Sequence, residues 1–213
     1  MKQTLISAPI VAMLSSGAIA GNIDLAIADP VIAIPPTSNV TDWSGSYCGL
    51  SYSSGGGTES SAIYGTYTYD YVDDTAIGGF CGNNWQRSNL VYGVELNVTA
   101  GSLAIDEFSF PDELGARTEL RARVGYAMGD ALVYGFLGYG TSDLTFVTTG
   151  TGYDVAGGTY GLGVDYMVTD RMFAGVEVSN LELTGTTTVG PGHGIEFTHD
   201  INVISLRIGW KFN

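Results

Sequence analysis

Basic residues, cysteine and long apolar segments are all scarce in this chain. Its 213 residues include only 8 Lys and Arg against 22 Asp and Glu, which gives a formal net charge of −14. A protein that binds nucleic acid needs a basic face, so this balance argues against a nucleic-acid partner. Only 14% of the residues are charged, whereas Gly occurs 31 times and Tyr 13 times. This composition is unlike that of an ordinary soluble enzyme, and it favours an all-β fold over a helical bundle.

The N-terminus has the features of an export signal. Residues 1–20 combine one Lys, an apolar stretch interrupted by Ser, Pro and Gly, and a final small-residue run, Ala18-Ile19-Ala20. They predict a secretory signal peptide cleaved after Ala20, with a second possible site after Ala28. No later apolar run is long enough for a membrane helix. Residues 21–42 hold three prolines and no periodicity, so we expect an extended periplasmic leader before one domain over residues 43–213.

The segment from Gly115 to Gly140 carries the clearest pattern in the chain. Apolar residues alternate with charged ones in its first half, and the charged face consists of Arg117, Glu119, Arg121 and Arg123. A period of two belongs to a β-strand. A soluble barrel fills its interior with apolar side chains, whereas a charged inner face and an apolar outer face suit a lipid environment. Gly129-Asp130 then predicts a tight hairpin turn into a returning strand.

The same alternation recurs along the chain and predicts eight strands. They cover residues 43–53, 76–86, 90–101, 115–128, 131–144, 155–168, 171–183 and 199–212. Three short turns and four long loops connect them alternately, which places both chain ends on the side of the short turns. Unpaired backbone groups are too costly in hydrocarbon for the sheet to have an edge. We therefore expect an antiparallel up-and-down transmembrane β-barrel with eight strands, short periplasmic turns and long extracellular loops.

A secreted soluble barrel of the lipocalin kind is the competing interpretation, because it also has eight strands with an apolar face turned inward. The charged residues on the polar faces favour the membrane barrel. They can share one interior, where both signs are equally represented and can neutralise each other, as buried charge requires. The predicted ionic network in the lumen consists of Glu95, Glu119, Arg121, Arg123, Asp165, Glu177, Arg207 and Lys211.

The sequence resembles the small Gram-negative outer-membrane β-barrels related to the OmpA-type transmembrane domain, especially the porin-like surface proteins of that group. The motifs that carry the resemblance cover the chain from Trp43 onward, and they are WSGSYCG at 43–49, GNNWQ at 82–86, YGVE at 92–95, GY at 125–126 and RIGWKF at 207–212. The resemblance implies an outer-membrane location and a structural or small-pore role, without an enzyme activity. It also implies that Trp210 and Phe212 form the signal read by the barrel-assembly machinery, although Asn213 follows the final aromatic residue here.

Three functions remain open at this point. The charged residues could plug the lumen or line a narrow path for small solutes, and we favour the plug because eight strands leave an interior that side chains can fill. An adhesive or receptor role for the loops is the third possibility, since Tyr64, Tyr67, Tyr69 and Tyr71 form either a rim girdle or a recognition face. No G-x-S-x-G motif points to a hydrolase.

The long loops predict a strongly negative outer surface, since they contain no Lys or Arg. Their acidic residues are Glu59, Asp70, Asp73, Asp74, Asp106, Glu107, Asp112, Glu113, Asp154 and Glu196. Solubility and long-range repulsion account for them most simply. Divalent cations that bridge these carboxylates to anionic lipopolysaccharide are the functional alternative. Outer-membrane lipid and lipopolysaccharide are therefore the expected surroundings, and host or environmental ligands could bind the acidic loops.

The two cysteines and two histidines leave further alternatives. Cys48 and Cys81 lie at matching heights if the first hairpin is symmetric about residues 64 and 65, so export to an oxidising compartment permits a disulfide, with two free thiols as the alternative. His193 and His199 are six residues apart in a glycine-rich segment. That spacing is weak evidence for a metal, and we expect two surface histidines and no cofactor.

Overall fold

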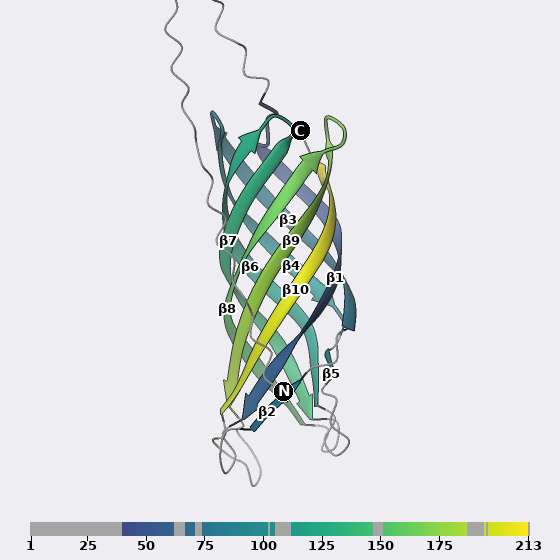
Figure 1. The fold of residues 1–213 in the computed structure, drawn as a ribbon, viewed down its shortest axis with the longest axis vertical. Helices are drawn as coiled ribbons and strands as arrows, with labels where there is room; N and C mark the ends of the chain where they lie inside the picture. The colour runs from purple at the N-terminus through teal and green to yellow at the C-terminus, as the bar shows by residue number, and fades with distance from the viewer. Residues whose placement is uncertain are drawn as a thin grey trace, which may run out of the picture. The chain divides into compact units, whose positions relative to one another are not determined.

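The chain folds into a closed β-barrel, seen in a computed structural model that describes residues 40–61, 67–70, 74–101, 103–104, 112–146, 151–186, 194 and 196–212 (Figure 1). Eight long strands form the wall. They are β1 (Gly45–Ser61), β3 (Asp74–Arg87), β4 (Leu90–Ala100), β6 (Asp112–Met128), β7 (Ala131–Phe146), β8 (Thr151–Met167), β9 (Met172–Thr186) and β10 (Glu196–Lys211). Two short strands, β2 (Tyr67–Asp70) and β5 (Leu103–Ala104), pair with the ends of β1 and β6.

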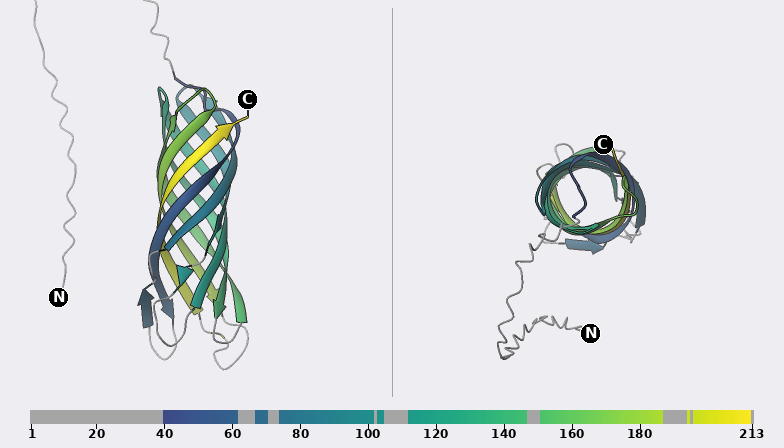
Figure 2. Two further views of the ribbon diagram at one scale, coloured as in Figure 1. Left: turned by 90° about the vertical axis from the view of Figure 1, so that its right-hand side faces the viewer. Right: turned by 90° about the horizontal axis from the view of Figure 1, so that it is seen from above.

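Each long strand pairs antiparallel with the next, and β10 pairs with β1 to close the ring (Figure 2). The pairing is staggered. The partners that follow Ser46 around the wall are Asn83, Val94, Ala122, Leu137, Tyr160, Asn180 and Asn202, and the path returns to β1 at Gly56, ten residues further along. A stagger of this size makes the strands tilt steeply against the barrel axis, as in Figure 1.

The expected strand order is confirmed, but the strands are longer than predicted at the end that carries the long connections. β1 continues to Ser61, β6 begins at Asp112, β8 at Thr151 and β10 at Glu196. The sequence in these extensions is rich in Gly, Ser, Thr and acidic residues, so it lacks the apolar alternation on which the prediction depended. Backbone pairing with neighbouring strands extends the sheet there without that signal.

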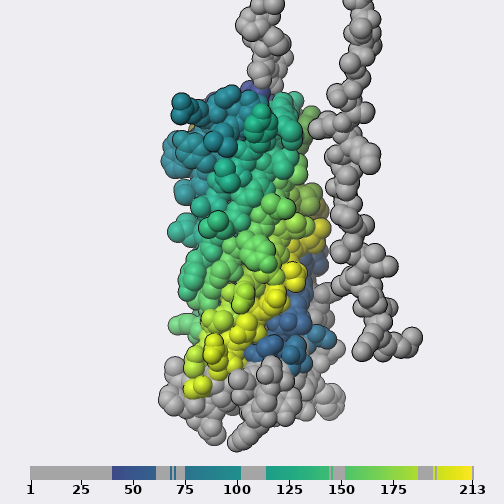
Figure 3. All heavy atoms as spheres, turned by 60° about the vertical axis from the view of Figure 1, so that its left-hand side comes forward, coloured from purple at the N-terminus to yellow at the C-terminus, as the bar shows by residue number. Residues whose placement is uncertain are grey.

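The outer wall is apolar along the part of the barrel nearest the short turns. Figure 3 shows this wall as a surface of side chains from successive strands. Leu137, Leu162 and Leu120 point outward and are 69%, 65% and 63% exposed. Glu119 and Arg121, which flank Leu120 in the sequence, point inward and are each 5% exposed. This distribution is the inverse of a soluble barrel, so the lipocalin-like alternative is excluded and the wall faces lipid.

Two apolar clusters fill opposite ends of the interior. The periplasmic cluster lies at the end of the short turns and consists of Trp43, Tyr47, Phe80, Val91, Ala127, Leu132, Tyr134, Phe136, Met167 and Phe173. The extracellular cluster consists of Leu114, Val155, Leu181, Leu183 and Ile201. The sequence predicts that the first strand begins at Trp43, but β1 begins at Gly45 and Trp43 precedes it. The Trp43 ring packs edge-on against the Phe173 ring, with 5.8 Å between the ring centroids. Among the described residues no helix is long and apolar enough to cross a membrane.

Candidate functional site

The interior between the two apolar clusters is built from charged side chains that alternate with the lipid-facing residues of five strands. The residues are Glu95 on β4, Glu119, Arg121 and Arg123 on β6, Asp165 on β8, Glu177 on β9 and Arg207 on β10. Each is at most 5% exposed. A buried charge is costly unless it is paired. The contacts among these seven residues therefore decide whether the charged lumen is stable.

Arg207 and Glu95 are at the centre of this network. The Arg207 Nη2 atom lies 2.6 Å from Glu95 Oε2, and its Nη1 atom donates to Glu177 Oε2. The Arg207 Nε atom is 3.9 Å from Asp165 Oδ1. One guanidinium therefore contacts carboxylates from three different strands and ties them across the lumen.

The two arginines of β6 complete the network. Arg121 Nη1 is 2.6 Å from Glu177 Oε1, and Arg121 Nη2 is 2.9 Å from Glu119 Oε2. Arg123 pairs with Glu95 at 3.1 Å and with Asp165 at 2.9 Å. Because Arg121 and Arg123 are two residues apart on one strand, they lie at successive levels and link β6 to β4, β8 and β9.

Aromatic rings hold the guanidinium groups from the side. The Cζ atoms of Arg123, Arg207 and Arg121 lie 3.8, 4.0 and 4.4 Å from the ring centroids of Tyr134, Phe80 and Phe136, respectively. The hydroxyl of Tyr134 donates to Glu177 Oε2 at 3.1 Å. These rings fill the space around the ion pairs and add cation–π attraction to them.

Lys211, the eighth predicted member, lies apart from the network. Its Nζ atom donates to the main-chain carbonyl of Asp42 at the periplasmic mouth, and the Asp42 carboxylate attracts it from nearby, while none of the described network carboxylates forms an ion pair with it. The prediction placed it in the network because it shares the inward face of β10 with Arg207. Four residues further along a tilted strand, however, it has passed the level of the carboxylates. The Ser44 hydroxyl and amide both donate to Asp42 and hold the pKa of that carboxyl below its usual value.

Arg117 supplies the fourth positive charge instead. It is 6% exposed and lines a small cavity together with Glu119 and Arg121, on the extracellular side of the network. The seven paired residues contain four carboxylates and three guanidiniums. With Arg117 included, the net charge of these eight buried residues is zero. The sequence shows the alternation of Arg117 with Glu119 on β6, but the predicted network does not include Arg117.

Glu59 and His199 lie inside the barrel, contrary to the surface positions expected for them. His199 is fully buried, Glu59 is 2% exposed, and the distance from His199 Nδ1 to Glu59 Oε2 is 3.7 Å. Glu59 belongs to the extension of β1 that the sequence did not reveal, whereas His199 is the first residue of the last predicted strand and was expected at the surface because it borders the fourth loop. His193 lies outside the described residues, and no group of three or more potential metal ligands occurs within the described part of the chain.

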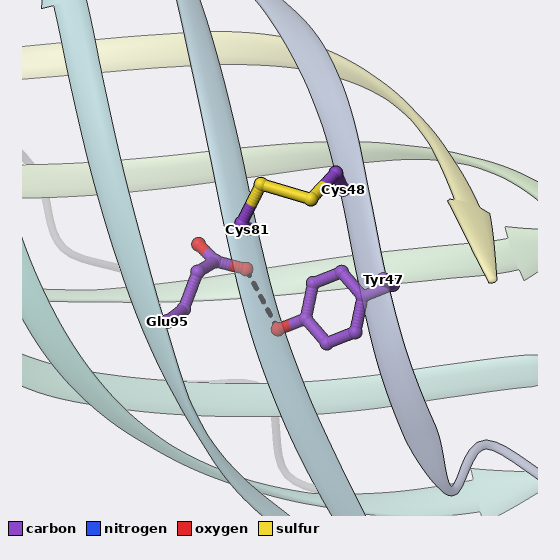
Figure 4. Close-up of a disulfide and its surroundings, with 4 residues drawn as sticks. All are labelled: Tyr47, Cys48, Cys81 and Glu95. Carbon is purple, nitrogen blue, oxygen red and sulfur yellow. Dashed lines mark hydrogen bonds between the residues drawn. A yellow bond between two sulfur atoms is a disulfide. The ribbon is translucent and has the colours of Figure 1, made fainter. Parts of the chain in front are cut away.

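Cys48 and Cys81 are directly opposite each other in the β1–β3 pairing, and their sulfur atoms form a disulfide (Figure 4). Tyr47, the neighbour of Cys48, is 2% exposed and lies on the inner side of the wall, where its hydroxyl donates to Glu95 Oε2 at 2.9 Å, the dashed line in Figure 4. The disulfide is thus on the lipid-facing side of the wall, while the ionic network begins one residue away on the inner side.

The terminal aromatic residues face outward. Trp210 is 44% exposed and Phe212 is 60% exposed, and the Phe212 amide donates to the carbonyl of Ser46 on β1. The tyrosine run of the first loop lies outside the described residues, apart from the backbones of Tyr67 and Tyr69 in β2.

The sequence matches the family described as "Outer membrane protein beta-barrel domain" over residues 26–212. It is 28% identical to a 22 kDa outer membrane protein of Rhizobium leguminosarum bv. viciae over 83% of this chain and 82% of the relative. It is also 28% identical to a 25 kDa outer-membrane immunogenic protein of Brucella canis, over 86% of this chain and 85% of the relative.

A solved structure shares the fold. The outer membrane protein OprG from Pseudomonas aeruginosa superposes with a TM-score of 0.57 at 14% sequence identity, over 82% of this chain and 99% of OprG. The family match covers most of the chain and the geometry is that of a closed barrel with a lipid-facing wall. This chain therefore belongs to the outer membrane protein β-barrel domain family.

Proposed function

We propose that this barrel is a closed structural protein of the bacterial surface, without channel or enzyme activity. The observation that carries the proposal is the filling of the lumen by successive layers. The periplasmic cluster, the ionic network and the extracellular cluster follow one another along the axis. A solute would have to displace apolar packing at both ends and separate buried ion pairs between them.

The energetic cost of opening supports a closed state. Breaking one buried ion pair by removing a partner costs about 3–5 kcal/mol, and Arg207 alone contacts three carboxylates. The rings of Phe80, Phe136 and Tyr134 also occupy the space into which the arginines would have to move. A water-filled path would therefore require several contacts to break together.

Planar-bilayer conductance tests this proposal. Wild-type protein is expected to give no steady channel events, and Glu119→Ala is expected to give none either, because Arg121 still pairs with Glu177. A large-pore porin prepared in the same way shows that insertion and recording work. Stable unitary conductance from the wild-type barrel would contradict the closed state and support the small-solute pore.

The same proposal places lipopolysaccharide around the extracellular end of the barrel. Asp143 and Asp154 are directly opposite each other on β7 and β8, and Glu182 and Asp200 are opposite each other on β9 and β10. All four are exposed, so divalent cations can bridge their carboxylates to the anionic lipopolysaccharide. Surface exposure is also supported by the relative that is named an immunogenic protein.

Binding of cells to protein with residues 62–73 removed, compared with the full chain, tests the adhesive alternative.

Export and assembly belong to this proposal as well. Residues 1–20 are removed as a signal peptide, residues 21–42 form the periplasmic leader, and the barrel-assembly machinery reads Trp210 and Phe212. N-terminal sequencing of protein from the outer membrane is expected to begin at Gly21. Phe212→Ala is expected to leave more unfolded precursor in the periplasm than Leu206→Ala, which changes the same strand further from its end.

A further inference from the structure

The Cys48–Cys81 disulfide joins β1 to β3 on the outer side of the wall (Figure 4). Its neighbours in the same row of the sheet are directly opposite the two cysteines. Trp210 on β10 faces Cys48, and Leu96 on β4 faces Cys81. Both of these side chains point outward, and they are 44% and 47% exposed, respectively. The bond therefore lies between two side chains that contact lipid.

The disulfide is deep within the apolar part of this wall. The outward face of β4 is apolar on both sides of Leu96, and it consists of Leu90, Tyr92, Val94, Leu96 and Val98. On β3, Trp85 lies four residues from Cys81 toward the short turn, and Ile77 lies four residues away in the other direction. A strand rises about 3.3 Å per residue, so each is about 13 Å from Cys81 along the strand. Trp85 stacks on Tyr92 with 5.9 Å between the ring centroids, which places the membrane–water interface there and the disulfide in the hydrocarbon.

Aromatic rings close the inner side of the wall behind the disulfide. Tyr47 and Phe80 are sequence neighbours of the two cysteines, and each is 2% exposed. Their ring centroids are 6.2 Å apart, and Arg207 Cζ lies 4.0 Å from the centroid of Phe80. A water-soluble reagent in the lumen would have to pass this packing and then the backbone of the wall. The bond is therefore shielded from water on both of its sides.

Disulfide exchange needs an ionised thiol. A thiolate, and not a neutral thiol, attacks the sulfur of a disulfide, both when a new bond forms by exchange and when a thiol reduces an existing bond. An isolated ion is not solvated in hydrocarbon, so free thiols of Cys48 and Cys81 would stay protonated there. Hydrophilic oxidants and reductants are excluded from the same layer. Exchange at this pair is therefore blocked in the inserted barrel.

We propose that Cys48 and Cys81 are joined in the periplasm before the barrel enters the membrane, and that insertion then protects the bond from reduction. The oxidant is a protein disulfide, the class of partner that an oxidising periplasm supplies. One cysteine thiolate attacks it to give a mixed disulfide, and the second thiolate displaces the oxidant from that bond. The oxidant leaves as a dithiol with the two electrons and the two protons. This order rests on the proposed export route, and it makes oxidation the step that supplies the substrate for insertion.

The pairing of β1 with β3 allows the bond to form early. The two cysteines are directly opposite in a single antiparallel pair, with a sequence separation of 33 residues. Closure of the ring instead needs the β1–β10 pair, which joins residues from opposite ends of the barrel sequence, such as Cys48 and Trp210. The bond depends on the first hairpin alone, so it can form while the rest of the chain is still unfolded.

The rates of bond formation before and after insertion test the proposal. The reduced full chain is treated with oxidised glutathione either unfolded in urea or folded in phospholipid nanodiscs, whose two aqueous faces are both open. Samples are trapped with acid, unfolded and alkylated, their masses are measured, and heat-modifiable gel migration checks the folding. The wild-type rate is expected to fall at least about a hundredfold on insertion, because it follows the thiolate fraction. Reduction of the oxidised chain by reduced glutathione is expected to slow by a similar factor.

A cysteine pair outside the apolar wall is the matched control. Asp143→Cys with Asp154→Cys, in a chain with Cys48→Ala and Cys81→Ala, places a directly opposite pair on the exposed outer face of β7 and β8. Its rate is expected to change less than about tenfold on insertion, since water reaches both thiols. A wild-type rate that also falls less than about tenfold would overturn the proposal, whether or not the control pair forms its bond.

Pulse–chase labelling in cells tests the order of the two steps. Thiols are trapped by alkylation at each time, and unfolded and folded chains are separated by heat-modifiable gel migration. The wild-type chain is expected to carry the bond already in the unfolded band, and a bond that appears only in the folded band would overturn the proposal. A chain that never reaches the outer membrane would contradict the proposed export instead, and the nanodisc rates would still decide whether insertion protects the bond. Channel events in planar bilayers would bear only on the closed lumen.

Discussion

Replacing Arg207 by Met should destabilise the barrel more than any other single loss of a positive charge. The Arg207 side chain is 1% exposed and contacts Glu95, Glu177 and Asp165. Methionine keeps much of the apolar contact with the Phe80 ring but leaves these carboxylates with fewer partners in a buried site. Removing one partner of a buried ion pair costs about 3–5 kcal/mol, and this is the loss expected for the free energy of unfolding.

Urea unfolding in phospholipid vesicles measures this loss, with the folded fraction read from heat-modifiable gel migration. Arg171→Met is the matched control, because Arg171 is exposed at a short turn, and its effect should stay within about 0.5 kcal/mol. The double variant Arg207→Met with Glu95→Gln removes one charge of each sign. Its loss should be smaller than the sum of the single losses by about 0.5–3 kcal/mol, since the two residues interact directly.

Two results would refute the reasoning. If Arg207→Met unfolds at the same urea concentration as Arg171→Met, the ion pairs do not hold the lumen together. If the losses of Arg207→Met and Glu95→Gln simply add, the two side chains do not interact in the folded barrel, and the network described above is wrong.

Other predictions concern the wall. Reduction should add about 2 Da to the protein mass, and Cys48→Ala with Cys81→Ala should lower the free energy of unfolding by about 2–4 kcal/mol, because the bond closes a loop with a sequence separation of 33 residues. An unchanged mass would mean free thiols. Gly161→Ala should destabilise the barrel by about 1–3 kcal/mol in the same urea assay, because its Cβ would lie 2.4 Å from the Val178 main-chain oxygen and 2.5 Å from Phe136 Cζ. Gly158→Ala, with nothing within 4 Å of its Cβ, should be tolerated, and equal effects would show that Val178 and Phe136 do not crowd Gly161.

The alternation along each strand was sufficient to predict which residues face the lumen. It places both Arg121 and Glu177 on the inner face, and in the structure Arg121 Nη1 lies 2.6 Å from Glu177 Oε1. Their pairing could not be predicted, because it depends on the stagger of ten residues around the wall. Two residues 56 positions apart meet only through the register of the two intervening strands, β7 and β8.

The errors have physical causes too. Lys211 lies on the inward face of β10, as predicted, but closer to the periplasmic mouth than the carboxylates of the network. A period of two predicts the face of a residue and not its height along the barrel axis. Glu59 is expected at the surface because β1 continues beyond the apolar wall, where Gly, Ser and Thr replace the alternating pattern. His199 is expected there because it begins the last predicted strand, next to a long loop, but β10 already starts at Glu196. Strand ends that are held by backbone pairing alone leave little trace in the sequence.

The central claim is that the wall is apolar outward and ionic inward, and oxygen accessibility measured by electron paramagnetic resonance tests it most directly. Spin labels are placed one at a time at residues 160–166 of β8, in vesicles and in a variant without Cys48 and Cys81. Oxygen accessibility should peak at Leu162, Val164 and Tyr166 and fall at Gly163 and Asp165. Peaks at Gly163 and Asp165, or no alternation at all, would contradict the account.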